Sequence, residues 1–220
     1  MIYALFPGGF KPPHLGHLKV VEAILKKKPD LLYIIISKKP RLLIPPYKKI
    51  YQVSQNELRE ISQHYHKTYT KKTLEKDALA GKIPAITALD SYEIWKLYLQ
   101  TLPEKSRQKI KLYISPFDSP IIFALTVISK KVKKNDTLIL TKSEKNGENQ
   151  RFSVFDKLAE QGVKLVYQNV PKYNDLDSTL ARQYLVENRK NKFYKFLPKN
   201  LKPKEKKEIW DLLHKQKGFV

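Results

Sequence analysis

Two histidines near the amino terminus, His14 and His17, stand three residues apart shortly after the glycine pair Gly8 and Gly9. Side chains three positions apart project from the same side of a helix. Glycines let a backbone come close to a ligand, and a helix start presents free amides and the positive end of its dipole. An isolated H-x-x-H pair is more often a surface feature, but here the glycines and the helix start accompany it. The pattern predicts a phosphate-binding site.

The segments on either side of the glycines are those that would position such a site. Residues 2–6 form an almost continuous apolar run, which is typical of a buried strand in a parallel sheet, and Pro7 with the glycines is expected to end it. Apolar residues then recur at helical spacing: Leu15, Leu18, Val21, Ile24 and Leu25. Gly16 lies between the histidines, where a side chain would stand between a ligand and the backbone. The sequence therefore predicts a strand, a glycine turn and a helix in that order.

The residues Phe10, Pro12, His14, Gly16 and His17 resemble a known family signature. They match the G-x-F-x-P-x-H-x-G-H motif that follows the first strand in the nucleotidyltransferase superfamily, the cytidylyltransferase-like enzymes. Weaker similarity to phage- and virus-type members extends over residues 91–99, 114–116, 193–198 and 208–213. The resemblance covers most of the chain and leaves out residues 42–85.

A second motif of the same family, S-S/T-x-x-R at a helix start, has a counterpart far downstream. Ser178, Thr179 and Arg182 match it after an apolar segment and a loop, about 160 residues beyond the first motif. Members often have isoleucine where this chain has Asp177, which we expect to be a helix N-cap. Two motifs in the expected order are more specific than either alone.

The resemblance implies an enzyme that transfers a nucleoside monophosphate from ATP or CTP to an acceptor with a phosphate or hydroxyl group and releases pyrophosphate. His14 and His17 would stabilise the α-phosphate and its leaving oxygen, Lys11 would assist them, and Arg182 would help to bind the β and γ phosphates. Such chemistry depends mostly on positioning and charge neutralisation. Magnesium would be bound through the nucleotide phosphates, and no protein metal site is expected.

The resemblance also implies which residues hold the nucleotide. Backbone near the ligand would come from Gly8, Gly9, Phe10 and Gly16, and the β and γ phosphates would lie at Ser178 and Thr179. A basic residue after the second strand often holds the α-phosphate or the acceptor in this family. Lys38, Lys39 and Arg41 are the candidates, and the sequence does not choose between them.

The rest of the chain alternates apolar runs with helical patterns. Strands are expected over residues 31–36, 110–114, 137–141 and 163–167, and helices over residues 90–102, 120–131 and 152–161. Such alternation predicts an α/β fold with a doubly wound parallel sheet, Rossmann-like as in the H-x-G-H nucleotidyltransferases. Ligands of these sheets lie beyond the carboxyl ends of the strands, so both motifs should meet there.

Two segments depart from this alternation within one predicted domain, residues 1–220. An insertion after the second strand, residues 42–85, would cap the acceptor, contact nucleic acid through its tyrosines, lysines and histidines, or decorate the surface as helices with a solvated basic face. A basic helical extension, residues 186–220, contains aromatic residues that indicate packing against the domain. The sequence leaves open whether the protein forms a homo-oligomer.

The amino-acid composition excludes several classes of protein. The 220 residues include no cysteine, which excludes disulfides and thiolate zinc sites. Apolar runs are too short to cross a bilayer, and the first strand leaves no room for a signal peptide, so a cytoplasmic protein is expected, with a viral or phage origin left open. The net charge of +22 suits nucleotides and polyanions alike. Nucleic acid is not expected to be the main substrate.

Three other classes of protein share some of these features. Class I aminoacyl-tRNA synthetases share the H-x-G-H type of motif, but this chain is short and has no convincing K-M-S-K-S loop. A basic nucleic-acid-binding protein would explain the charge and not the paired motifs. An inactive structural relative on the same fold would have little reason to keep both histidines and Arg182.

Overall fold

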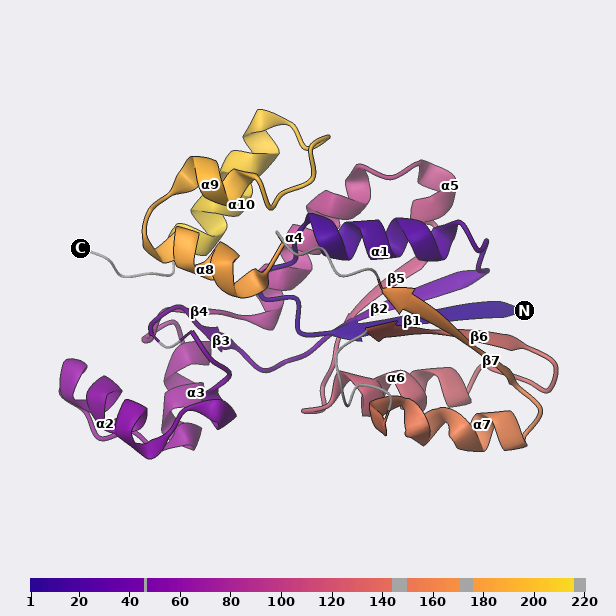
Figure 1. The fold of residues 1–220 in the computed structure, drawn as a ribbon, viewed down its shortest axis with the longest axis horizontal. Helices are drawn as coiled ribbons and strands as arrows, with labels where there is room; N and C mark the ends of the chain where they lie inside the picture. The colour runs from indigo at the N-terminus through magenta and orange to yellow at the C-terminus, as the bar shows by residue number, and fades with distance from the viewer. Residues whose placement is uncertain (46, 144–149, 171–175, 216–220) are drawn as a thin grey trace.

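The amino-terminal apolar run is the central strand of a five-stranded sheet (Figure 1). The computed structural model describes residues 1–45, 47–143, 150–170 and 176–215. The strands are β1 (Ile2–Gly8), β2 (Leu31–Ile36), β5 (Ile110–Ile114), β6 (Thr137–Ser143) and β7 (Lys164–Val170). They lie in the order β5-β2-β1-β6-β7, and all neighbours pair in parallel. The predicted doubly wound, Rossmann-like fold is confirmed.

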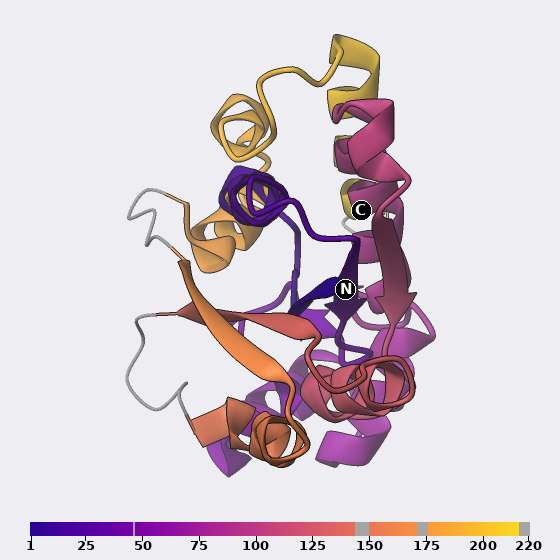
Figure 2. The ribbon, with the colours of Figure 1, turned by 90° about the vertical axis from the view of Figure 1, so that its right-hand side faces the viewer.

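Helices cover both faces of the sheet, because alternate strand residues point to opposite sides (Figure 2). On one side lie α1 (Leu15–Leu25), α4 (Ala88–Gln100) and α5 (Glu104–Arg107). On the other lie α6 (Pro120–Ser129), the 3-10 turn η2 (Gln150–Phe155) and α7 (Asp156–Glu160). Ala4 and Phe6 of β1 enter the first core, while Tyr3 and Leu5 enter the second.

Two of the differences from the sequence-based expectation have a clear physical cause. Strand β1 continues through Pro7 to Gly8, because β6 pairs with β1 only as far as Leu5 and leaves Pro7 with one neighbouring strand, a setting that tolerates proline. The helix predicted over residues 152–161 is instead η2 followed by the short α7. Phe152 and Phe155 are both buried, and a 3-10 turn places residues three apart on the same side.

The segment after β2 forms a small lobe with its own apolar core (Figure 1, lower left). Its elements are β3 (Arg41–Leu42), the 3-10 turn η1 (Ile50–Gln52), α2 (Gln55–His64), α3 (Lys71–Leu79) and β4 (Ala85–Ile86). Strands β3 and β4 pair antiparallel, so the chain enters and leaves the lobe through one two-stranded ribbon. That ribbon fixes the lobe beside the carboxyl end of β2.

The last helices pack on the α1 side of the sheet (Figure 2). They are α8 (Ser178–Val186), α9 (Lys190–Tyr194) and α10 (Pro203–Lys215), and residues 216–220 of the predicted basic extension lie outside the described residues. Phe193, Phe196 and Trp210 are buried in the core that contains α1 and α4. No helix in the described ranges combines the length and apolarity needed to span a membrane.

Candidate functional site

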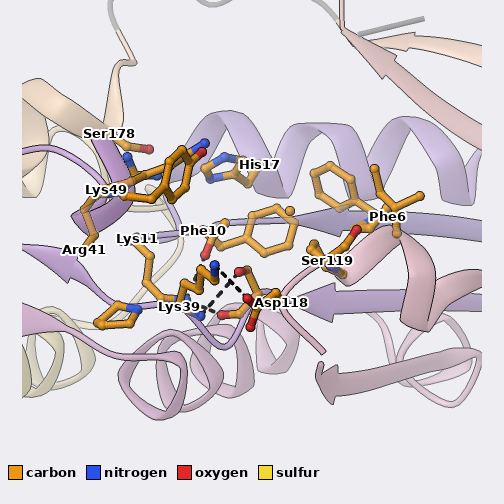
Figure 3. A pocket seen from close by; sticks show the side chains of 18 of the residues that line it. Phe6, Phe10, Lys11, His17, Lys39, Arg41, Lys49, Asp118, Ser119 and Ser178 are labelled. Atoms are coloured by element: carbon orange, nitrogen blue, oxygen red, sulfur yellow. Dashed lines mark hydrogen bonds and ion pairs between the residues drawn. The ribbon is translucent and has the colours of Figure 1, made fainter. Parts of the chain in front are cut away.

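A cavity of about 640 Å³ opens beyond the carboxyl ends of β1 and β2 (Figure 3). The glycine turn, the ends of the strands, the ribbon of the small lobe and the start of α8 all contribute to its wall. Its polar and charged lining residues are Lys11, His17, Ser37, Lys39, Arg41, Lys49, Tyr51, Asp118, Ser119, Thr141, Ser178 and Arg182. Five of these are lysine or arginine and one is a carboxylate, so the described wall favours an anion.

The glycine turn is shaped by packing against Phe10. A Cβ atom on Gly8 would lie 2.6 Å from the buried Phe10 ring, so that ring would have to shift, whereas a Cβ on Gly9 would meet Arg41 at an ordinary 3.7 Å. Phe10 itself has a φ of 49°. Its carbonyl accepts a hydrogen bond from the Ser91 hydroxyl at 2.6 Å, which ties the turn to α4. The fold therefore holds the backbone of the first motif in one conformation.

His14 and His17 form a capping box at the start of α1. The Nδ1 atom of His14 accepts from the Gly16 amide at 3.1 Å, and the Nδ1 atom of His17 accepts from the His14 amide at 3.1 Å. An imidazole that accepts at Nδ1 carries its proton at Nε2. We therefore assign both rings as neutral Nε2–H tautomers, with centroids 3.7 Å apart. His17 lines the cavity, while His14 lies behind it, outside the described wall.

Burial keeps both imidazoles uncharged. It lowers the pKa of His14 to about 4, against a smaller opposing effect of Asp177. Burial also lowers the pKa of His17 well below its usual range, and the neighbouring His14 adds to this. At neutral pH the site offers His17 as a hydrogen-bond donor without a positive charge.

The neutral state of His14 predicts a specific acid sensitivity. Between its folded pKa of about 4 and its ordinary value of 6.5, the unfolded chain binds more protons than the folded protein. The contribution of neutral His14 to the free energy of unfolding is therefore fully present above pH 6.5. It falls by about 3 kcal/mol as the pH drops towards 4. We expect His14→Asn, whose amide oxygen can still accept from Gly16, to lose less free energy of unfolding than the wild type between pH 6.5 and pH 4, as measured by urea unfolding. The same pH dependence in both proteins would contradict the assignment.

Lys11 lies inside the first motif and is buried, with 3% of its surface exposed. Its Nζ donates to the carbonyls of Gly9 and Ser37, both at 2.9 Å, and so bridges the ends of β1 and β2. Burial lowers the pKa of Lys11 to about 7, and the charge of Arg41 adds to the effect. This lysine sits at the carboxyl ends of the two central strands.

Arg182 of the second motif meets the first motif directly. Its Nη1 donates to the Lys11 carbonyl at 2.7 Å, and its Nη2 donates to the Tyr47 carbonyl at 3.2 Å and to the Thr179 hydroxyl at 2.9 Å. The side chain is buried, and its Nε has no hydrogen-bond partner among the described residues. Burial, then Arg41, lowers the pKa of Arg182 to about 10. Arg182 thus joins the first motif, the small lobe and α8.

At the start of α8, Ser178 faces the cavity and Thr179 does not. Asp177 is the N-cap and accepts from the Thr179 amide at 2.5 Å, which confirms the predicted cap. Ser178 lines the cavity (Figure 3). Thr179 is exposed, its hydroxyl accepts a hydrogen bond from Arg182, and it does not line the described wall. Gly16 of the first motif also lies outside that wall.

The three basic candidates after β2 separate in the structure. Lys38 and Lys39 both pair with Asp118, at 3.1 and 2.8 Å, and of these two only Lys39 lines the cavity. Arg41 also lines the cavity, and it has no ion pair among the described residues. The structure therefore brings Lys39 and Arg41 to the site and leaves Lys38 outside it.

Several wall residues were not anticipated from the sequence. Asp118 and Ser119 lie between β5 and α6, a strand end followed by a helix start, and that pattern could have identified them. Lys49 and Tyr51 come from the small lobe. No spacing in the sequence distinguishes them from the other lysines and tyrosines of that segment.

Among solved structures, 16 chains match this chain. No family model matches the chain, and no curated protein matches it. The chain is similar to the crystal structure of Thermotoga maritima TmcAL bound with alpha-thio ATP, with 11% sequence identity and a TM-score of 0.38. The match covers 94% of this chain and 54% of that one, so the chain spans about half the length of its neighbour. A likeness of this size carries no conclusion about activity.

Proposed function

We propose that the protein is a nucleotidyltransferase, which transfers a nucleoside monophosphate from ATP or CTP to an acceptor with a phosphate or hydroxyl group and releases pyrophosphate. The observation that carries this proposal is the meeting of the two motifs. Arg182 donates to the Lys11 carbonyl at 2.7 Å, and His17 and Ser178 line one cavity. Residues far apart in the sequence therefore gather where a doubly wound sheet binds its ligands.

The proposed reaction needs no covalent intermediate. An acceptor oxygen attacks the α-phosphorus, the bond from that phosphorus to the bridging oxygen breaks, and pyrophosphate leaves with the bond electrons. A hydroxyl acceptor gives up its proton to solvent, and an ionised phosphate acceptor has none to lose. The Nε2–H of His17 would donate to an α-phosphate oxygen, where negative charge is concentrated in the transition state. Ser178 and the amides at the start of α8 would bind the leaving phosphates.

Magnesium fits this site as part of the nucleotide. Among the described lining residues the only carboxylate is Asp118, which is already paired with Lys38 and Lys39. The metal would therefore be held through phosphate oxygens, and it would neutralise part of the triphosphate charge. The lysine and arginine side chains of the wall supply the remaining positive field, Lys11 only in part because its pKa is about 7.

The test combines nucleotide binding with turnover. Thermal unfolding is measured with each of the four nucleoside triphosphates and magnesium, followed by pyrophosphate release with a panel of phosphate and hydroxyl acceptors. We expect ATP or CTP to raise the melting temperature, since a ligand at one hundred times its Kd adds about 2.7 kcal/mol to the free energy of unfolding. Pyrophosphate release should require both that nucleotide and an acceptor.

Other outcomes would favour the rival interpretations. Stabilisation by a nucleotide without pyrophosphate release from any acceptor would favour an inactive relative. If no nucleotide stabilises the protein and RNA binds with a steep salt dependence, the nucleic-acid-binding interpretation replaces the enzyme.

A further inference from the structure

The loop between β1 and α1, residues 9–14, carries the first motif and forms no helix or strand. Pro12 and Pro13 have no amide to donate, so the backbone of the loop can do little to hold its own shape. Side chains from elsewhere in the chain bind its carbonyls instead. The carbonyls of Phe10 and Pro13 both accept from a single helix, α4. The conformation of the loop therefore depends on that helix.

The two donors on α4 are buried hydroxyl groups. The Oγ of Ser91 donates to the Phe10 carbonyl at 2.6 Å, and the Oη of Tyr98 donates to the Pro13 carbonyl at 3.1 Å. Ser91 also lies 3.2 Å from the Thr87 carbonyl, but a hydroxyl has one proton and the contact with Phe10 is shorter. Neither side chain is exposed to solvent. Burial raises the pKa of Tyr98, so its hydroxyl stays protonated and remains a donor.

Ring contacts connect the same face of α4 to the catalytic candidate. Ser91, Trp95 and Tyr98 lie at helical spacing, so all three can meet the loop. The Trp95 ring packs on the Phe10 ring in a T-shaped arrangement, with centroids 5.4 Å apart. The Phe10 ring in turn meets the His17 ring at 5.0 Å, again T-shaped. A displacement of the loop from α4 would therefore also move His17.

We propose that Ser91 and Tyr98 are positioning residues for the proposed nucleotidyl transfer, on which this inference rests: they hold the loop so that the Nε2–H of His17 faces the α-phosphate. Neither residue lines the described wall of the cavity, so both act through the loop. A misplacement of about 1 Å can cost about 10²-fold in rate. The wall residues Ser178 and Lys39 come from other elements, so nucleotide affinity should change much less than the rate.

The first measurement is steady-state kinetics of Ser91→Ala and Tyr98→Phe, each of which removes one hydroxyl. We expect kcat to fall at least tenfold and the KM for the nucleotide to change less than threefold. Ser91→Cys keeps a weak donor and should have an intermediate kcat. The matched controls are Ser106→Ala on α5 and Tyr92→Phe on α4, because neither side chain forms a hydrogen bond among the described residues. Both controls should keep the kcat of the wild type.

The second measurement needs no turnover. Long-range ¹H–¹⁵N spectra report the imidazole nitrogens, and the His17 signals are identified by their loss in His17→Asn. In the wild type the Nδ1 of His17 accepts from the His14 amide. We expect its signal to shift in Ser91→Ala and Tyr98→Phe and to stay in place in the two controls.

Three results would overturn the inference. The variants could keep the kcat of the wild type, they could raise the KM with kcat unchanged, or they could lower the melting temperature and leave both kcat and the His17 signal unaltered, as residues that only pack the core would. If the wild type itself released no pyrophosphate, the proposed function would fail. The His17 signal would then decide alone: a shift in both variants would support the positioning, and an unchanged signal would refute it.

Discussion

Replacing His17 with asparagine should lower pyrophosphate release at least a hundredfold while the protein stays folded. The asparagine oxygen can take the place of Nδ1 and accept from the His14 amide, so the capping box of α1 is kept. The change removes the Nε2–H that faces the cavity. Loss of one donor to the charge that develops in a transition state costs about 10²–10³ in rate. Steady-state kinetics and thermal unfolding of the same preparation measure both effects.

The matched control is His64→Asn, which makes the same chemical change at an exposed position near the end of α2. It should leave turnover and melting temperature at wild-type values. Normal turnover by His17→Asn would show that His17 takes no part in catalysis. A large fall in its melting temperature would show that the capping box was lost, and the rate could then not be assigned to the missing donor.

Replacing Arg182 with methionine should have the largest effect on stability. Methionine removes the donors that serve the carbonyls of Lys11 and Tyr47. The Lys11 carbonyl is buried and the Tyr47 carbonyl is partly buried, and such acceptors left without donors cost about 1–3 kcal/mol each; loss of the buried charge offsets part of this, so we expect a net loss of about 3 kcal/mol. For a chain of this size the melting temperature should fall by about 6–12 °C. Nucleotide affinity should fall more than tenfold, because the first motif and α8 are no longer joined.

Arg59→Met is the control for this change, since Arg59 is exposed on α2. Its melting temperature should stay within about 2 °C of the wild type, as surface substitutions rarely exceed 0.5 kcal/mol. If Arg182→Met kept both its stability and its nucleotide affinity, the hydrogen bonds of Arg182 between the motifs would contribute neither to stability nor to binding.

The fold was largely predictable because each strand of the sheet is an apolar run of its own. Residues 31–36 and 110–114 became β2 and β5 with the predicted bounds. Strand ends were less certain, because pairing decides them. Pro7 breaks a strand by local preference, and it is retained in β1 because only β2 flanks it there.

The site was predictable only where a motif marks it. The two motifs meet as expected. The sequence predicts Arg182 as a phosphate ligand, whereas in the structure its Nη atoms donate to two carbonyls and a hydroxyl of the protein itself. Lys49 and Arg41 become neighbours through a backbone bridge inside the small lobe. Such a pairing is a property of tertiary structure, and the pattern of single residues does not reveal it.

The aromatic contacts beneath the glycine turn give the protein an optical reporter. The Trp95 ring lies 5.4 Å from Phe10, and Phe10 lies 5.0 Å from His17, so an indole stands two rings away from the proposed ligand. The chain has one other tryptophan, Trp210, in α10. In a Trp210→Phe background, emission would come from Trp95 alone, and cavity occupancy could be followed in real time without a label.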